Sequence, residues 1–100
     1  MMPRLRIRRR VTDGRHVFRL EGELDGSTAC QALDTVGRAP GDGRGLEVDL
    51  SAVRLIGTFG LEILSRGLTR LAHQREVFIV DSTRRWPSGV VSVPGVAPGA

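Results

Sequence analysis

The chain has 100 residues, of which 40% are apolar, enough for one modest hydrophobic core and too few for two. Its formal charge of +4 comes from fifteen arginines and no lysine against eleven carboxylates, a balance too mild to require a nucleic-acid partner. No apolar run approaches the roughly 18 residues of a membrane span, and the arginine-rich start lacks the apolar stretch of a secretory signal. We therefore expect a cytoplasmic protein with no direct membrane insertion.

Residues that form disulfides or bind metals are scarce. Cys30 is the single cysteine, so it has no partner within the chain. His16 and His73 are the two histidines, and their spacing with Cys30 matches no zinc or iron ligand set. We expect no disulfide, no metal site and no cofactor.

The first predicted element is a β-hairpin. Residues 5–11 alternate apolar and charged side chains, residues 17–21 alternate again, and Asp13-Gly14 between them is typical of a tight turn. Residues 4–10 contain five arginines, which we interpret as the solvent face of a strand. A nucleic-acid site is disfavoured because the chain has only three Phe and one Trp for base stacking.

A helix is predicted after the second strand. Thr28 followed by Gln31 has the form of a capping box, and Gly37 is a plausible C-terminal cap. Cys30 falls within this helix among alanines, so we expect a buried thiol.

Residues 46–80 have the pattern of a βαβ unit. A strand at 46–50 and a connection at 51–57 precede a long amphipathic helix from about Thr58 to His73. The apolar run at 77–80 is typical of a strand covered on both faces in a parallel sheet. The fold class is therefore α/β, with a single mixed sheet, an N-terminal hairpin, and helices mainly on one face.

The pattern weakens after Asp81. Residues 82–85 could start a third helix, but Pro87 and Gly89 oppose its continuation. We expect one domain over residues 1–86 and a Pro/Gly-rich, disordered tail over 87–100, whose valine-rich segment could pack against the sheet edge. The C-terminus of the fold is thus truncated or irregular.

The sequence contains no set of residues with the spacing typical of general acid-base catalysis in an enzyme active site. Glu21, Glu23 and Asp25 gather near the end of the second strand, but their spacing fixes no catalytic separation. We interpret them as a polar strand end, and we expect no catalytic residue.

Thr58 stands where the connection at 51–57 meets the long helix. Its side-chain oxygen is expected to cap the helix, and an alanine there should cost on the order of 1 kcal/mol. The alternative role is regulatory, because an exposed hydroxyl at a helix N-terminus sits where a phosphate is tolerated.

Three segments resemble the STAS domain, the fold of anti-sigma factor antagonists. They are Phe18–Asp25, which contains Gly-Glu-Leu-Asp, Val48–Val53, which contains Asp-Leu-Ser, and the sequence Thr58-x-Gly60-Leu61. The resemblance covers roughly residues 5–85. It implies a non-enzymatic binding module whose partner is an anti-sigma factor with serine/threonine kinase activity, with a serine/threonine phosphatase as a further partner.

The resemblance also implies site residues. Thr58 falls on the phosphoacceptor, and Asp25 falls on an acid of the partner-facing surface. Gly57 stands where the family has Asp, and Phe59 where it has a small residue; we expect Phe59 in the core, with an exposed anchor as the alternative. The full set expected to bind the partner is Glu23, Asp25, Gly26, Gly57, Thr58, Phe59, Gly60, Leu61 and Glu62.

Two other functions stay open for a chain with this resemblance. One is a small regulatory subunit of an ABC lipid-transport system, which uses the same fold. The other is a degenerate STAS module that binds its partner constitutively, a hypothesis motivated by Gly57.

Overall fold

The alternation of apolar and charged residues in the first third of the chain produces the hairpin that the sequence predicts. In the computed structural model, which describes residues 4–80 and 90–93, β1 (Leu5–Val11) pairs antiparallel with β2 (Arg15–Leu24). Leu5, Phe18 and Leu20 are buried, whereas the arginines of β1 are exposed, so the arginine-rich start is the solvent side of a strand.

The sheet continues by parallel pairing. The described strands lie in the order β1-β2-β3-β4-β5, and β3 (Gly45–Leu55), β4 (Val77–Val80) and β5 (Val90–Val93) are each parallel to the strand before them. The helix α1 (Gly26–Gly37) connects β2 to β3, and α2 (Phe59–Leu71) connects β3 to β4. The predicted βαβ unit, β3-α2-β4, is present, and β2-α1-β3 forms a second unit before it.

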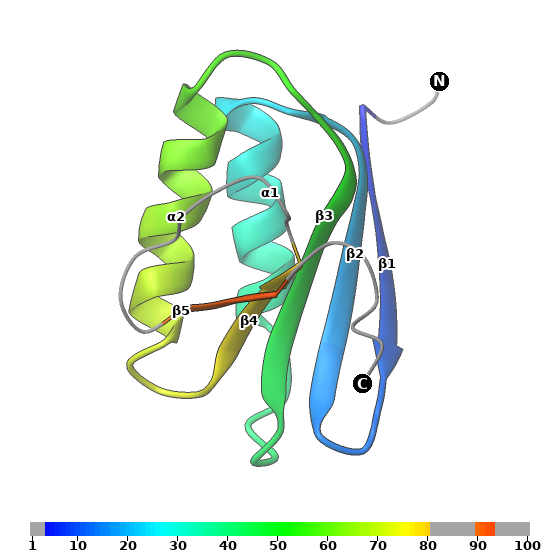
Figure 1. The fold of residues 1–100 in the computed structure, drawn as a ribbon, viewed down its shortest axis with the longest axis vertical. Helices are drawn as coiled ribbons and strands as arrows, with labels where there is room; N and C mark the ends of the chain where they lie inside the picture. The colour runs from blue at the N-terminus through cyan, green and yellow to red at the C-terminus, as the bar shows by residue number, and fades with distance from the viewer. Residues whose placement is uncertain (1–3, 81–89, 94–100) are drawn as a thin grey trace.

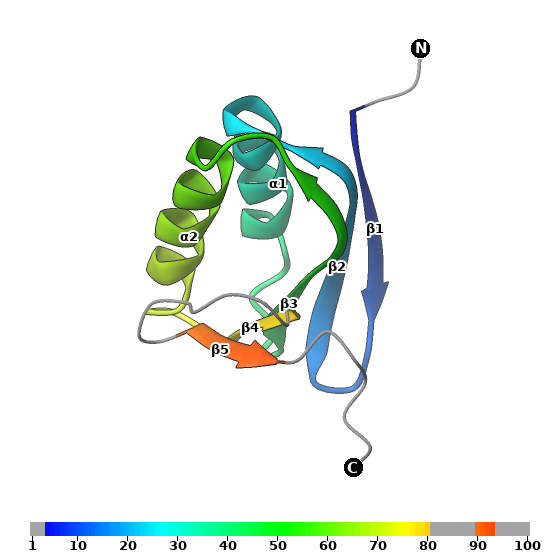
Figure 2. The same cartoon turned by 45° about the horizontal axis from the view of Figure 1, so that its top comes forward.

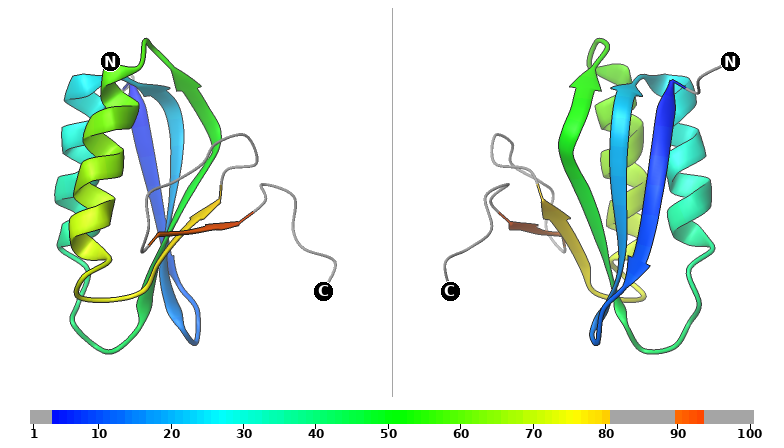
Figure 3. Two further views of the ribbon diagram at one scale, coloured as in Figure 1. Left: turned by 60° about the vertical axis from the view of Figure 1, so that its left-hand side comes forward. Right: turned by 90° about the vertical axis from the view of Figure 1, so that its right-hand side faces the viewer.

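Both helices cover the same face of the sheet, as predicted, and the other face carries no described helix (Figures 1 and 3). The core lies between the helices and the sheet. It is built from fourteen buried apolar residues, namely Leu5, Phe18, Leu20, Leu24, Ala29, Ala32, Val36, Leu46, Val48, Leu50, Leu64, Leu68, Val77 and Ile79. The starts of α1 and α2 lie at the same end of the molecule (Figure 2).

The structure corrects two strand predictions. The segment 51–55, predicted as part of a connection, continues β3, because β2 itself runs to Leu24 and pairs with β3 as far as Leu55 after a register shift between Arg19 and Glu21. The prediction that β4 is covered on both faces is wrong. Val77 and Ile79 are buried under the helices, while Phe78 and Val80 on the opposite face are half-buried.

The start of α1 also differs from the prediction. The capping box is formed by Asp25 and Thr28, and the pair Thr28 and Gln31 does not make it. The helix therefore begins at Gly26, and Thr28 is its third residue. Of the C-terminal predictions, the third helix start at 82–85 lies outside the described residues, and so does most of the predicted tail; within it, Val90–Val93 form β5.

At the end of the sheet opposite the helix starts, a buried histidine joins the hairpin to the α1–β3 loop. His16 is 2% exposed; its Nε2 lies 2.9 Å from Asp42 Oδ2, and Arg9 donates to its Nδ1 over 3.4 Å. The neutral imidazole with its proton on Nε2 satisfies both contacts. The amide of Arg44 donates to Asp42 Oδ1 over 3.0 Å. This bond first, and His16 next, hold the pKa of Asp42 well below its ordinary value.

We predict that Asp42→Asn destabilises the fold at pH 7 and weakens its acid sensitivity. The pKa of Asp42 is lower in the folded than in the unfolded chain, so its stabilising contribution is present above the unfolded pKa of about 3.9 and is lost as the pH falls. Urea unfolding followed by circular dichroism at pH 7 and at pH 3 measures both effects.

The exposed carboxylate of Asp34 on α1 supplies the control for this experiment. Asp34→Asn should leave the difference in unfolding free energy between the two pH values close to that of the wild type. An Asp42→Asn variant whose stability falls between pH 7 and pH 3 as steeply as the wild type's would contradict the role given to Asp42.

Candidate functional site

The first turns of the two helices touch each other through backbone. A Cβ at Gly60 would lie 2.6 Å from both the carbonyl carbon and the carbonyl oxygen of Asp25, so glycine is required for this approach. On the other helix, Gly26 lies under the ring of Phe59, where a Cβ would stand 2.9 Å from Cδ2. These contacts bring the predicted residues at 25–26 and at 58–60 into one site.

The start of α1 is closed by hydrogen bonds. Asp25 Oδ1 accepts from the Thr28 amide over 2.9 Å, and Thr28 Oγ1 accepts from the Asp25 amide over 2.8 Å. Arg4 Nη1 donates to the other carboxylate oxygen over 2.6 Å. These bonds, that from the Thr28 amide first, lower the pKa of Asp25. Asp25, predicted to face a partner, is thus half-buried and engaged through both oxygens.

The start of α2 is open by comparison. Thr58 is the N-cap residue and is exposed, but its side chain makes no capping hydrogen bond, so the predicted cap is wrong. The physical reason is the backbone of Thr58, which already has helical dihedral angles (φ −106°, ψ −14°), whereas capping residues adopt an extended conformation. Thr58 is therefore an exposed residue whose hydroxyl makes no capping hydrogen bond at the start of α2.

The loop before Thr58 turns sharply. Gly57 has φ +72°, in the left-handed region that side chains other than glycine rarely adopt. Just before it, the amide of Ile56 donates to the carbonyl oxygen of Leu24 over 2.9 Å, which fixes the loop to the end of β2. Gly57 thus directs the chain from the sheet into α2.

Two apolar side chains stand exposed on either side of Thr58. Phe59 is 65% exposed and Ile56 is 43% exposed. The prediction that Phe59 enters the core is wrong, because the buried stripe of α2 runs through Gly60, Leu64 and Leu68, and Phe59 lies one residue outside it. Ile56 is not among the predicted site residues. The sequence feature that could have identified it is its position, an isoleucine in the connection two residues before the expected phosphoacceptor Thr58.

The other predicted site residues lie at the end of β2 and in the first turn of α2. Glu62 is exposed on the first turn of α2, and Leu61 is half-buried. Glu23 forms an ion pair with Arg54 of β3, a partner that strand periodicity alone did not indicate. We call residues 23–26 and 56–62 the helix-start surface.

The helix-start surface offers the Thr58 hydroxyl and the carboxylates of Glu23, Asp25 and Glu62. His16 lies at the hairpin end of the sheet and His73 follows α2, so neither histidine belongs to the helix-start surface. Among residues 4–80 and 90–93, no group of side chains is suited to hold a metal ion, and no helix is long and apolar enough to cross a membrane.

Cys30 is exposed, so its predicted burial is wrong. The buried positions of α1 are Thr28, Ala29, Ala32 and Val36, and Cys30 lies a helical step of about 100° from Ala29.

Comparison with known proteins identifies the fold. Residues 6–85 match the model of the STAS domain family, which confirms the resemblance seen in the sequence motifs. No curated protein sequence matches the chain significantly.

Two solved structures are similar to this one. The structure of an antisigma-factor antagonist STAS domain from Rhodobacter sphaeroides has a TM-score of 0.62 at 14% identity, over 76% of this chain and 85% of that one. An anti-sigma factor antagonist from Mycobacterium paratuberculosis has a TM-score of 0.61 at 29% identity, over 76% of this chain and 66% of that one. The first similarity, at its low identity, shows the fold alone.

We predict that Gly60→Ala destabilises the fold and displaces the start of α2. The added methyl group would collide with the backbone of Asp25, which cannot move aside as a flexible side chain can, and such overpacking costs about 1–3 kcal/mol. Chemical denaturation measures the loss. Gly37→Ala, at a helix end with no atom within 4 Å of the new Cβ, is the control and should leave stability unchanged or raise it. Equal effects of the two substitutions would contradict the close contact.

Proposed function

The chain belongs to the STAS domain family, and from this premise we propose that it is a non-enzymatic anti-sigma factor antagonist, switched by phosphorylation of Thr58. Its partner is an anti-sigma factor with serine/threonine kinase activity, and the helix-start surface is where that partner docks. A serine/threonine phosphatase restores the unmodified form. The proposal puts this exchange in the cytoplasm.

The single observation that carries the proposal is the exposed Thr58 hydroxyl, which takes no part in capping α2. A kinase can reach such a hydroxyl without unfolding the helix. The first-turn amides of a helix lack intrahelical acceptors, and they favour an anion placed there. A phosphate on Thr58 is therefore compatible with the folded domain. The similar structure from Mycobacterium paratuberculosis, an anti-sigma factor antagonist at 29% identity, supports the same partner class.

The apolar neighbours of Thr58 supply the docking energy in this proposal. An exposed aromatic side chain at the centre of an interface is a common anchor of binding energy. Phe59 and Ile56 stand exposed on either side of Thr58, so a partner that covers them also covers the hydroxyl. The unmodified hydroxyl is small and neutral and is easily accommodated in such an interface.

Phosphorylation changes the electrostatics of this contact. A phosphate brings about −1.5 to −2 charges, which would be desolvated beneath the partner and would repel any acid nearby. Glu62, exposed on the same first turn, is one such acid. A coupling of about 1–3 kcal/mol between phosphorylation and docking changes the affinity by about 5 to 150-fold.

We predict that Thr58→Glu weakens binding of the anti-sigma factor that copurifies with the tagged chain by at least about fivefold, whereas Thr58→Ala binds like the wild type. Calorimetry measures both affinities. Because Thr58 caps nothing with its side chain, neither variant should change the unfolding free energy by more than about 0.5 kcal/mol.

Gln74→Glu is the matched control, because it adds the same charge at an exposed position beyond the far end of α2. It should bind the anti-sigma factor as the wild type does. Equal affinities of Thr58→Glu and Thr58→Ala would refute the switch. Incubation with ATP and the copurified kinase, followed by mass spectrometry, separates a switch, which carries phosphate on Thr58, from a constitutive module, which carries none.

A further inference from the structure

The face of the sheet that carries no described helix is strongly arginine-rich. Strand alternation places Arg6, Arg8 and Arg10 of β1 on it, beside Arg15 and Arg19 of β2. Three carboxylates, Glu21, Glu47 and Asp49, share the surface. We call these eight residues the arginine face; it has no residue in common with the helix-start surface.

Ion pairs hold part of the arginine face in place. Glu21 accepts from Arg8 Nε over 3.0 Å and from Arg19 Nε over 3.1 Å, and Arg19 Nη1 reaches Asp49 over 3.3 Å. Both Nη groups of Arg8 and the second Nη of Arg19 are not used in these bonds. Donors that are held in place in this way lose less conformational entropy when they bind a ligand.

Two arginines give the face its surplus of positive charge. Arg6 and Arg10 are exposed and form no ion pair with any residue that the structure describes, whereas Arg15 is paired with Glu47 over 2.7 Å. An arginine presents its donors as a planar fork that fits a carboxylate with two parallel bonds. The guanidinium groups of Arg6 and Arg10 could therefore bind carboxylates that do not belong to the described residues.

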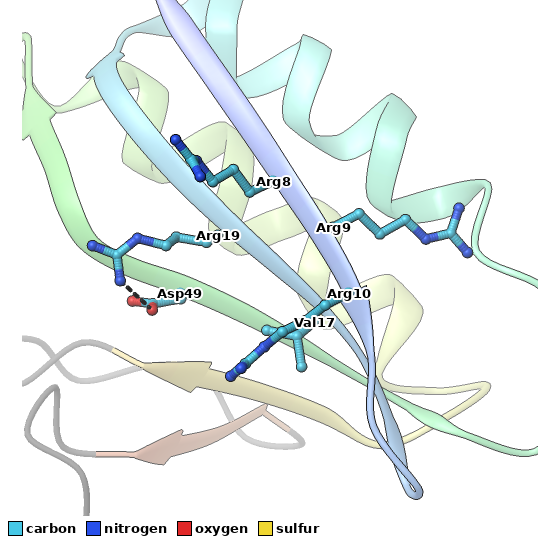
Figure 4. Close-up of a pocket in the computed structure, with 6 residues that line it drawn as sticks. All are labelled: Arg8, Arg9, Arg10, Val17, Arg19 and Asp49. Atoms are coloured by element: carbon cyan, nitrogen blue, oxygen red, sulfur yellow. Dashed lines mark hydrogen bonds and ion pairs between the residues drawn. The ribbon is translucent and has the colours of Figure 1, made fainter.

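A pocket of about 580 Å³ opens on this face, lined by Arg8, Arg9, Arg10, Val17, Arg19 and Asp49 (Figure 4). Figure 4 shows the side chain of Arg9 extending away from the other labelled side chains. Val17 is 4% exposed and gives the pocket an apolar wall between the arginine stems. The pocket thus suits an apolar side chain flanked by acidic ones.

We propose that the arginine face is a second docking surface, which binds an extended acidic segment of a partner protein. Arg8 and Arg10 are two residues apart on one strand, so their side chains stand about 7 Å apart. Acidic residues at alternate positions of an extended segment have the same spacing. One carboxylate meets Arg10 and the next meets Arg8. The residue between them points away from the face, so the apolar side chain that enters the pocket beside Val17 stands two residues further along, on the same side of the segment.

The composition of the face favours a protein segment over a nucleic acid. Glu21, Glu47 and Asp49 repel any anionic ligand, and they disfavour a nucleic acid, which carries a phosphate at every nucleotide, more than a segment that brings only two carboxylates to this face. Among residues 4–80 and 90–93, the aromatic ring on this face is Phe78. The Arg15 guanidinium covers it at 3.5 Å from the ring centroid, so the ring is not open to base stacking.

The test is fluorescence anisotropy with a short labelled extended peptide in which three successive alternate positions carry Glu, Glu and Val, so that all three side chains face the same side. We expect the full chain to bind this peptide, with an affinity that falls as salt is added. Arg10→Gln should weaken binding about tenfold, since a hydrogen bond to a charged group is lost. Arg10 is exposed and unpaired among the described residues, so this variant keeps the wild-type fold, as circular dichroism will verify.

Arg66→Gln, which removes the same charge from an exposed position on α2, is the matched control and should change the affinity by less than about twofold. A peptide with Gln in place of each Glu should not bind. Equal binding by Arg10→Gln and wild type, equal binding of the two peptides, or tighter binding of a single-stranded oligonucleotide than of the acidic peptide would each overturn the proposal.

Discussion

The contact between Gly60 and the backbone of Asp25 is the constraint on which the arrangement of this molecule depends. It sets how closely α2 approaches α1, because no side-chain atom can stand between the two backbones. The core stripe of α2 at Leu64 and Leu68 continues from this contact. With Gly60 turned toward α1, the residues just before it, Thr58 and Phe59, are turned outward, so close helix packing and an exposed functional surface have one cause.

The two helix starts differ in whether a side chain accepts a hydrogen bond from their first-turn amides. Asp25 and Thr28 close the start of α1 through reciprocal hydrogen bonds, and Arg4, the residue before β1, adds an ion pair with Asp25. The start of α2 has no side-chain cap, although a threonine stands there. The start of α1 is thus fixed by side-chain hydrogen bonds, while the start of α2 keeps a hydroxyl and first-turn amides that no side-chain cap engages, which is the arrangement the proposed switch requires.

Most of the fold could be predicted from periodicity, because the strands and helices each bury one face. The course of β3 past Leu50 could not, since it depends on the register shift in β2, which leaves no local signal. For the site, spacing identified Thr58 as a helix start. The exposure of Phe59 and Cys30 depended on the rotation of each helix about its axis, which tertiary packing sets. The absent cap followed from backbone angles that no residue type reveals.

Hydrogen exchange on the complex with the copurified anti-sigma factor tests the central claim most directly, namely that the helix-start surface is the docking site. The account predicts that amides in residues 23–26 and 56–62 exchange more slowly in the complex than in the free chain, while those at the far end of α2 keep their rates. Unchanged exchange across both segments, with protection elsewhere, would contradict it.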